Sequence, residues 1–107
     1  MSQPKRISRF VVIYDICVID DSYHEQRSSA KRRAKVMRIL YDYGIRTQLS
    51  VFEIELKGNQ YVELIERIKT VIRETTDKVY IYPIDGKSLN KILRLGKEPD
   101  VLSDFFF

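Results

Sequence analysis

The sequence predicts a small α+β domain, and three observations support this fold class. The chain has 107 residues, two of its segments have the periodicity of amphipathic helices, and three apolar segments resemble strands. Their order is strand, helix, one or two strands, helix, strand. Because two helices cannot cover both faces of such a sheet, we expect a ferredoxin-like βαββαβ arrangement with both helices on one face. A second copy of the chain would then cover the other face as a homodimer.

The first strand and helix lie in the N-terminal half. Residues 10–14 are continuously apolar, which predicts a strand buried on both faces. Residues 20–29 are polar and show no period, so we expect a loop there. A helix is predicted over residues 29–43, with Gly44 as its C-cap in the left-handed region.

The remaining core elements follow in order. Residues 45–56 predict strand, and their length favours a break near Leu49 into two short strands. Asn59 is the expected N-cap of a second helix, whose apolar stripe comprises Tyr61, Leu64, Ile65, Ile68, Val71 and Ile72. Residues 79–84 predict a last core strand, and Pro83 should lie near its end or on a sheet edge.

We expect a single domain over residues 1–107, with its core at about 10–84 and a dimerisation segment at about 85–107. The latter contains four aliphatic residues (Leu89, Ile92, Leu93 and Leu95) with too little chain to build another layer at home. It should form an extra C-terminal strand on the partner's sheet edge. The tip at 105–107 should be mobile in the free dimer or dock on a partner protein.

Composition excludes several classes of protein. Hydrophobic residues make up 44% and charged residues 32%, which excludes a disordered chain. The lone Cys17 excludes a disulfide scaffold. The longest apolar run, 10–14, is far shorter than the roughly 20 residues needed to cross a membrane. A cytoplasmic protein with no membrane association is expected.

The net charge of +4 is concentrated between residues 27 and 46. In this segment only Asp42 opposes seven basic side chains: Arg27, Lys31, Arg32, Arg33, Lys35, Arg38 and Arg46. Such a patch attracts polyanions, and nucleic acid is the commonest polyanion in a cytoplasm. The alternative is an ordinary solvated helix face.

Two residues are candidates for chemistry. Asp15 ends the first strand, where its carboxylate could hold a hard cation such as magnesium or simply begin a turn. Arg33 lies on the apolar stripe of its helix, so its guanidinium should point toward the sheet and could hold a phosphate beside the metal. Alternatively, its stem packs while its charged end reaches water.

Four segments together resemble the small CRISPR-associated protein family Cas2, the companion of the Cas1 integrase in spacer acquisition. They are residues 11–16, 33–36, 43–53 and 79–84. The most specific is Gly-x-Arg-x-Gln-x-Ser-Val-Phe-Glu over residues 44–53.

The resemblance implies a ferredoxin-like homodimer whose C-terminal strand crosses to the other subunit. It also implies that Asp15 and its symmetry mate bind one Mg²⁺ ion, with Mn²⁺ as an alternative. By position it assigns catalytic roles to Tyr14, Asp15, Arg33 and Phe52. In the same way, Lys35 and Arg46 match family positions in the basic set. The segment between Asp15 and Arg33 is longer than the linker typical of the family.

We therefore expect a subunit of the CRISPR adaptation machinery that binds protospacer DNA or RNA and partners the Cas1 integrase. Metal-dependent endonuclease activity accompanies this function in some family members, while others only bridge DNA. One alternative is a toxin-type endoribonuclease of the related virulence-associated fold. Another is a non-enzymatic ferredoxin-like regulatory module.

Overall fold

The structure is a computed structural model that describes residues 7–99. Its elements, in chain order, are β1 (Ile7–Asp15), α1 (Tyr23–Tyr41), β2 (Gly44–Gln48), β3 (Val51–Lys57), α2 (Gln60–Lys69), β4 (Lys78–Ile84) and α3 (Gly86–Leu89). None of the helices within this range is long and apolar enough to span a membrane.

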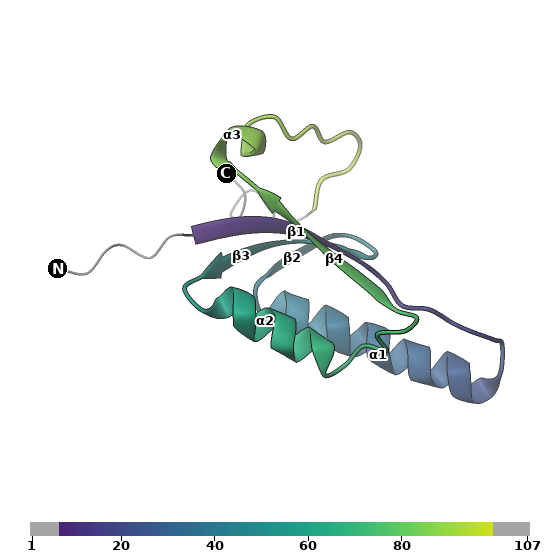
Figure 1. Cartoon of the computed structure of the whole chain (residues 1–107). Coiled ribbons are helices and arrows are strands. Elements are labelled where there is room, and N and C mark those ends of the chain that lie inside the picture. Colours follow the sequence, from purple (N-terminus) through teal and green to yellow (C-terminus); the bar gives the residue numbers. More distant parts are fainter. Residues whose placement is uncertain (1–6, 100–107) are drawn as a thin grey trace.

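The four strands form one antiparallel sheet in the order β2-β3-β1-β4. Helices α1 and α2 lie together on one face, as Figure 1 shows, so the predicted ferredoxin-like arrangement is confirmed. The expected break near Leu49 separates β2 from β3. Pro83 lies near the end of β4, which is an edge strand, and this is where a residue without an N–H is tolerated.

The core lies between the sheet and the two long helices. Val12 in β1 is fully buried, whereas its neighbour Ile13 is 41% exposed on the helix-free face. The prediction that residues 10–14 are buried on both faces was wrong, because side chains alternate along a strand and only one face is covered. Strands β1 and β3 supply buried side chains to the core, and β4 adds the partly buried Val79 and Ile81. The buried hydrophobic side chains are Val12, Tyr14, Ile16, Val36, Ile39, Leu40, Tyr43, Phe52, Ile54, Leu56, Leu64 and Ile68.

Helix α1 begins at Tyr23, so the predicted loop over residues 20–29 was largely wrong. The Ser22 hydroxyl caps the helix by accepting a hydrogen bond from the Glu25 amide at 3.2 Å. The Glu25 carboxylate reaches back to accept from the Ile19 amide at 3.3 Å. The Ser-x-x-Glu spacing that signals such a cap was present in the sequence.

Three further details differ from expectation. Gly44 is the first residue of β2 and has no positive φ, so it is not the predicted left-handed C-cap. Glycine is required there because a Cβ would lie 2.0 Å from the backbone oxygen of Glu53 on the adjacent strand. Asn59 precedes α2 as predicted but makes no side-chain capping bond, and the helix ends at Lys69 before the last two residues of the predicted stripe.

The segment after β4 lies on the helix-free side of the sheet (Figure 1). Its first turn is the short helix α3, because the Asp85 carboxylate caps it by accepting from the Ser88 amide at 2.7 Å. Residues 85–99 of the single chain contain no strand, and the extra C-terminal strand on a partner's sheet edge stays a prediction. Arg94 anchors this segment by pairing with Glu53 of β3, with N–O distances of 2.5 and 2.8 Å. The predicted tip at 105–107 lies outside the described residues.

Candidate functional site

Asp15 is the last residue of β1 and is exposed on the helix-free face. Its neighbour in the ladder is Lys78 of β4, which is also exposed. Within residues 7–99, no three His, Cys, Asp or Glu side chains are grouped closely enough to hold a metal ion. One chain therefore offers a single carboxylate, and a magnesium ion fits here only if further oxygen ligands come from water or from a second copy.

Tyr14 points to the opposite face of the sheet, because successive strand residues alternate. Its hydroxyl donates to the Leu49 carbonyl at 3.2 Å, and its amide donates to the Ser50 carbonyl at 3.1 Å. These two bonds fix the β2–β3 turn against the end of β1. Tyr14 thus lies next to Asp15 in sequence but faces the helix layer, while Asp15 faces solvent.

The surroundings of Tyr14 contain two of the predicted basic residues. Burial raises the pKa of the Tyr14 phenol, and the charges of Arg46 and Arg33 oppose that rise only in part. Arg33 is exposed rather than directed into the sheet, so the expectation that it points away from water was wrong. Arg46 is half-buried on β2 and donates to the Leu49 carbonyl at 3.1 Å. The two guanidinium groups therefore flank the helix-face side of the strand end.

Phe52 has no exposed surface. Its ring packs edge-on against Tyr41 at a centroid distance of 4.9 Å and lies 6.3 Å from the ring of Tyr14. Phe52 can therefore affect the site only by packing against Tyr14 and Tyr41 and holding their rings in position. The catalytic roles given to Tyr14, Asp15, Arg33 and Phe52 stay predictions.

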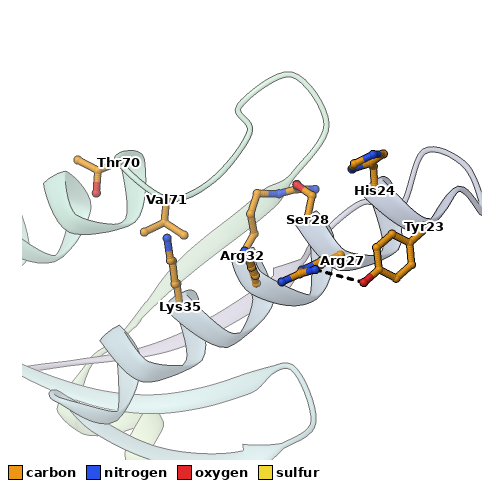
Figure 2. Close-up of a pocket in the computed structure, with 9 residues that line it drawn as sticks. Tyr23, His24, Arg27, Ser28, Arg32, Lys35, Thr70 and Val71 are labelled. Carbon is orange, nitrogen blue, oxygen red and sulfur yellow. Dashed lines mark hydrogen bonds between the residues drawn. The ribbon is translucent and has the colours of Figure 1, made fainter.

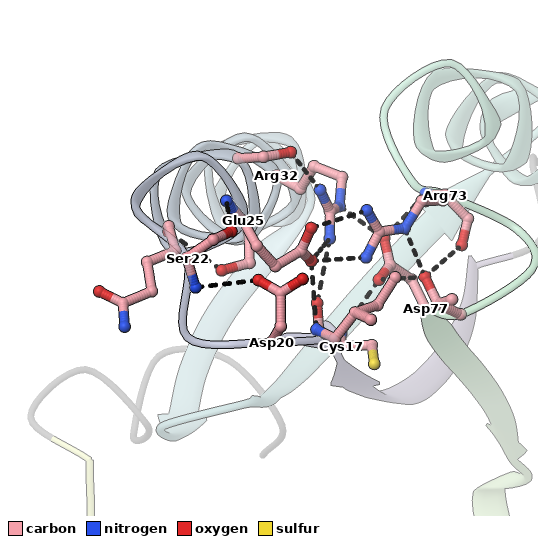
Figure 3. Close-up of polar contacts among 12 residues, drawn as sticks. Cys17, Asp20, Ser22, Glu25, Arg32, Arg73 and Asp77 are labelled. Atoms are coloured by element: carbon pink, nitrogen blue, oxygen red, sulfur yellow. Dashed lines mark hydrogen bonds and ion pairs between the residues drawn. The ribbon is translucent and has the colours of Figure 1, made fainter.

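A network of charged side chains holds the backbone that follows Asp15 (Figure 3). Its centre is Asp77, whose carboxylate accepts from the Cys17 amide at 3.0 Å, from Arg32 Nε at 2.9 Å and from the Arg73 amide at 2.8 Å. Arg32 also donates to the Cys17 carbonyl at 3.1 Å. Arg73 in turn pairs with Glu25 at 2.6 and 3.1 Å. The loop after β1, the first half of α1 and the loop before β4 are thereby joined.

The electrostatics of this network favour the charged forms of its acids. The hydrogen bond from Arg73 holds the pKa of Glu25 at about 2, well below its ordinary value of 4.5. Burial alone would raise the pKa of Asp77, but the Arg73 amide, Arg32 and the Cys17 amide outweigh burial and lower it. Sequence reasoning missed this network, and only the Ser-x-x-Glu cap pointed to one of its members.

The predicted nucleic-acid-binding residues fall into three groups. Arg32 is only 11% exposed at its side chain and is engaged by Asp77. Arg46 lies on β2, away from the helix. The other four residues are exposed along the outer face of α1: Arg27, Lys31, Lys35 and Arg38. The structure thus leaves these four cations on the outer face of α1, while Arg33 is exposed near Tyr14 on the same helix.

This fold and this site define a small ferredoxin-like protein with an exposed carboxylate at the end of a central strand and a basic outer helix face. The family model described as CRISPR associated protein Cas2 matches residues 8–92. The chain belongs to the Cas2 family.

Individual relatives agree with this assignment. A protein of Methanospirillum hungatei named CRISPR-associated endoribonuclease Cas2 2 is 38% identical over 93 residues, covering 86% of this chain and 91% of the relative. CRISPR-associated endoribonuclease Cas2 3 of Synechocystis is 32% identical over 90 residues, covering 84% and 86% respectively. The crystal structure of Streptococcus pyogenes Cas2 superposes with a TM-score of 0.69 at 27% identity, covering 82% of this chain and 99% of that one.

Proposed function

We propose that this protein is a homodimeric, nucleic-acid-binding subunit of the CRISPR adaptation machinery, with a magnesium-dependent phosphodiesterase centre at the paired Asp15 carboxylates. One observation carries the proposal: Asp15 is exposed on the same sheet face that also exposes large apolar side chains. That face needs a cover, and the cover would meet the carboxylate.

The homodimer is supported by the composition of the helix-free face. Ile13, Tyr80 and Tyr82 are 41%, 51% and 49% exposed there. Ile13 and Tyr80 are ladder neighbours, and the two tyrosine rings lie 6.4 Å apart, so the apolar surface is continuous. Burying each such side chain contributes about 1.5–3 kcal/mol at full burial. A two-fold contact over this face uses the same patch twice and would bring two Asp15 side chains toward one axis.

The chemistry follows from what the chain's own residues offer. Asp15 from each subunit would supply oxygen ligands to Mg²⁺, or to Mn²⁺ as the alternative ion. When bound, the ion would neutralise charge on a phosphodiester and lower the pKa of attacking water. Tyr14 holds the β2–β3 turn beside the strand end, and Arg33 and Arg46 add positive charge near the tyrosine. These guanidinium groups are suited to phosphate oxygens.

Within this function we rank the binding and bridging role above turnover. One carboxylate per subunit is sparse for metal-assisted hydrolysis, whereas four exposed cations on α1 are ample for contacts with a phosphate backbone. The relatives that are named endoribonucleases support the cleavage activity. Protospacer DNA and the Cas1 integrase are the partners expected for the bridging role.

The test is the Asp15→Asn variant, with Asp21→Asn as the matched control because Asp21 is an exposed acid in the following loop. Cleavage of RNA and of duplex DNA is measured with and without Mg²⁺, and light scattering gives the mass. Asp15→Asn should abolish metal-dependent cleavage while it preserves the dimer and integration in a complex reconstituted with Cas1. The control should behave as wild type. Wild-type cleavage by Asp15→Asn would refute the metal centre, and a monomeric wild-type protein would refute the dimer.

A further inference from the structure

A groove runs between α1 and α2 on the outer side of the helix layer. It consists of two adjoining hollows of about 490 Å³ and 320 Å³, which share Lys35 of α1 and Thr70 and Val71 after α2. Figure 2 shows Lys35 extending from α1 toward Val71, while Tyr23 and Arg27 lie near the first turns of the same helix. This groove is on the face of the molecule away from Asp15.

The groove is strongly basic. Arg27, Lys31 and Lys35 line the larger hollow, and Arg38 joins Lys35 in the smaller one. No acidic residue lines either hollow, and none of these four cations forms an ion pair among residues 7–99. The first three are four residues apart, which spaces them by roughly 6 Å along one side of the helix. They form one slanted row of positive charge along the helix.

The larger hollow ends at exposed aromatic side chains. Tyr23 is 70% exposed, and its ring lies edge-on to His24 at a centroid distance of 6.2 Å. Arg27 donates to the Tyr23 hydroxyl at 3.2 Å, so the tyrosine is held at the mouth of the basic row. A tyrosine this exposed in the first turn of a helix contributes little to the core, but its ring face is available for stacking.

We propose that this groove binds single-stranded nucleic acid, with phosphates along Lys31 and Lys35 and one base stacked on Tyr23. A basic groove that ends at an aromatic platform is the arrangement that single-strand binding requires. A duplex keeps its bases stacked inside and offers none of them to the Tyr23 ring, so the stacking contact favours a single strand. The inference deepens the proposed function and rests on it only for the class of ligand, because the groove is separate from Asp15.

The test measures fluorescence anisotropy with a labelled single-stranded RNA of about 10 nucleotides, a length within the usual range for single-strand grooves. A duplex of the same sequence is measured in parallel. Tyr23→Ala should weaken single-strand binding about tenfold and leave duplex binding unchanged, while Tyr23→Phe, which keeps the ring, should bind as wild type. The double variant Lys31→Gln/Lys35→Gln should lower the salt dependence by about 1.4, at roughly 0.7 per phosphate on a single strand.

The matched control is Lys57→Gln/Lys87→Gln, which removes two exposed charges outside the groove. It should leave the single-strand salt dependence nearly unchanged. The inference would be overturned if Tyr23→Ala bound the single strand as tightly as the wild type, or if it weakened single-strand and duplex binding equally. It would also be overturned if the two lysine pairs changed the single-strand salt dependence equally. Cleavage by Asp15→Asn is measured separately. The single-strand inference can therefore be refuted while the proposed metal centre is supported, and the metal centre can be refuted while the inference is supported.

Discussion

Replacing Asp77 with asparagine should destabilise the fold far more than a surface change of the same chemistry. The Asp77 side chain is fully buried and accepts hydrogen bonds from Arg32 and from the amides of Cys17 and Arg73. Asparagine has the same shape, but it has no charge and offers one acceptor oxygen in place of two. Arg32 would then be left nearly buried with only the Glu25 carboxylate, whose Oε1 lies 3.7 Å from its Nη2.

The magnitude follows from the burial of this pair. Removing one partner of a buried ion pair costs about 3–5 kcal/mol, because the remaining charge stays desolvated. A domain of this size has roughly 5–15 kcal/mol of total stability, so the loss is a large fraction of it. Asp42→Asn is the matched control, since Asp42 pairs with Arg67 at 2.7 Å but the two side chains are 57% and 37% exposed. Its expected cost is about 0–1 kcal/mol.

Urea unfolding, followed by far-UV circular dichroism at one fixed protein concentration, gives both free energies. Hydrogen exchange adds a local measurement, because the Cys17 amide donates to Asp77 at 3.0 Å and should exchange faster in the variant. A loss for Asp77→Asn no greater than that for Asp42→Asn would refute the reasoning. In that case the Glu25 carboxylate or water would compensate the Arg32 charge.

Three further predictions concern other parts of the structure. The contribution of Glu25 to stability should be complete above its ordinary pKa of 4.5 and be lost as the pH falls toward about 2, because the folded state holds this carboxylate ionised. Urea midpoints of the wild type and of Glu25→Gln across this range measure that contribution. Gly44→Ala should cost about 1–3 kcal/mol or more, since its Cβ would meet the Glu53 backbone oxygen, whereas Gly86→Ala, with nothing within 4 Å, should be close to neutral in the same unfolding assay. Arg94→Gln should release the segment after β4 from Glu53, and chymotrypsin should then cleave within residues 89–95 faster than in the wild type.

The order of the elements and the covered face of the sheet were predictable from the sequence because both depend on local periodicity. Phe52, Ile54 and Leu56 alternate with acids, and this alone determines which side of β3 enters the core. The start of α1 was also encoded locally, in Ser22 and Glu25, but a polar composition obscured it. The missed start of α1 is therefore a case where one capping residue outweighs average composition.

The pairing of charges was not predictable in the same way. Arg32 and Asp77 are 45 residues apart, and Arg73 and Glu25 are 48 apart, so no local pattern connects them. In the sequence, nothing indicates that Arg32 is buried and paired while its neighbour Lys31 is exposed. Only the rotation of α1 relative to the sheet turns Arg32 toward Asp77, although Arg32 borders the same groove that Lys31 lines.

This rotation links the two candidate sites on opposite faces of the molecule. Arg32 holds the loop after Asp15 through Cys17, while the next cations on the same helix, Lys31 and Lys35, line the outer groove. A change at Asp77 should therefore disturb both sites, because it loosens the loop and the helix together. A change at Lys31 or Lys35 should affect only the groove, since neither forms an ion pair in the described part of the chain. If one helix serves both sites, the Asp77 change affects both of them while the lysine changes affect one. Two independent surfaces would not produce this difference.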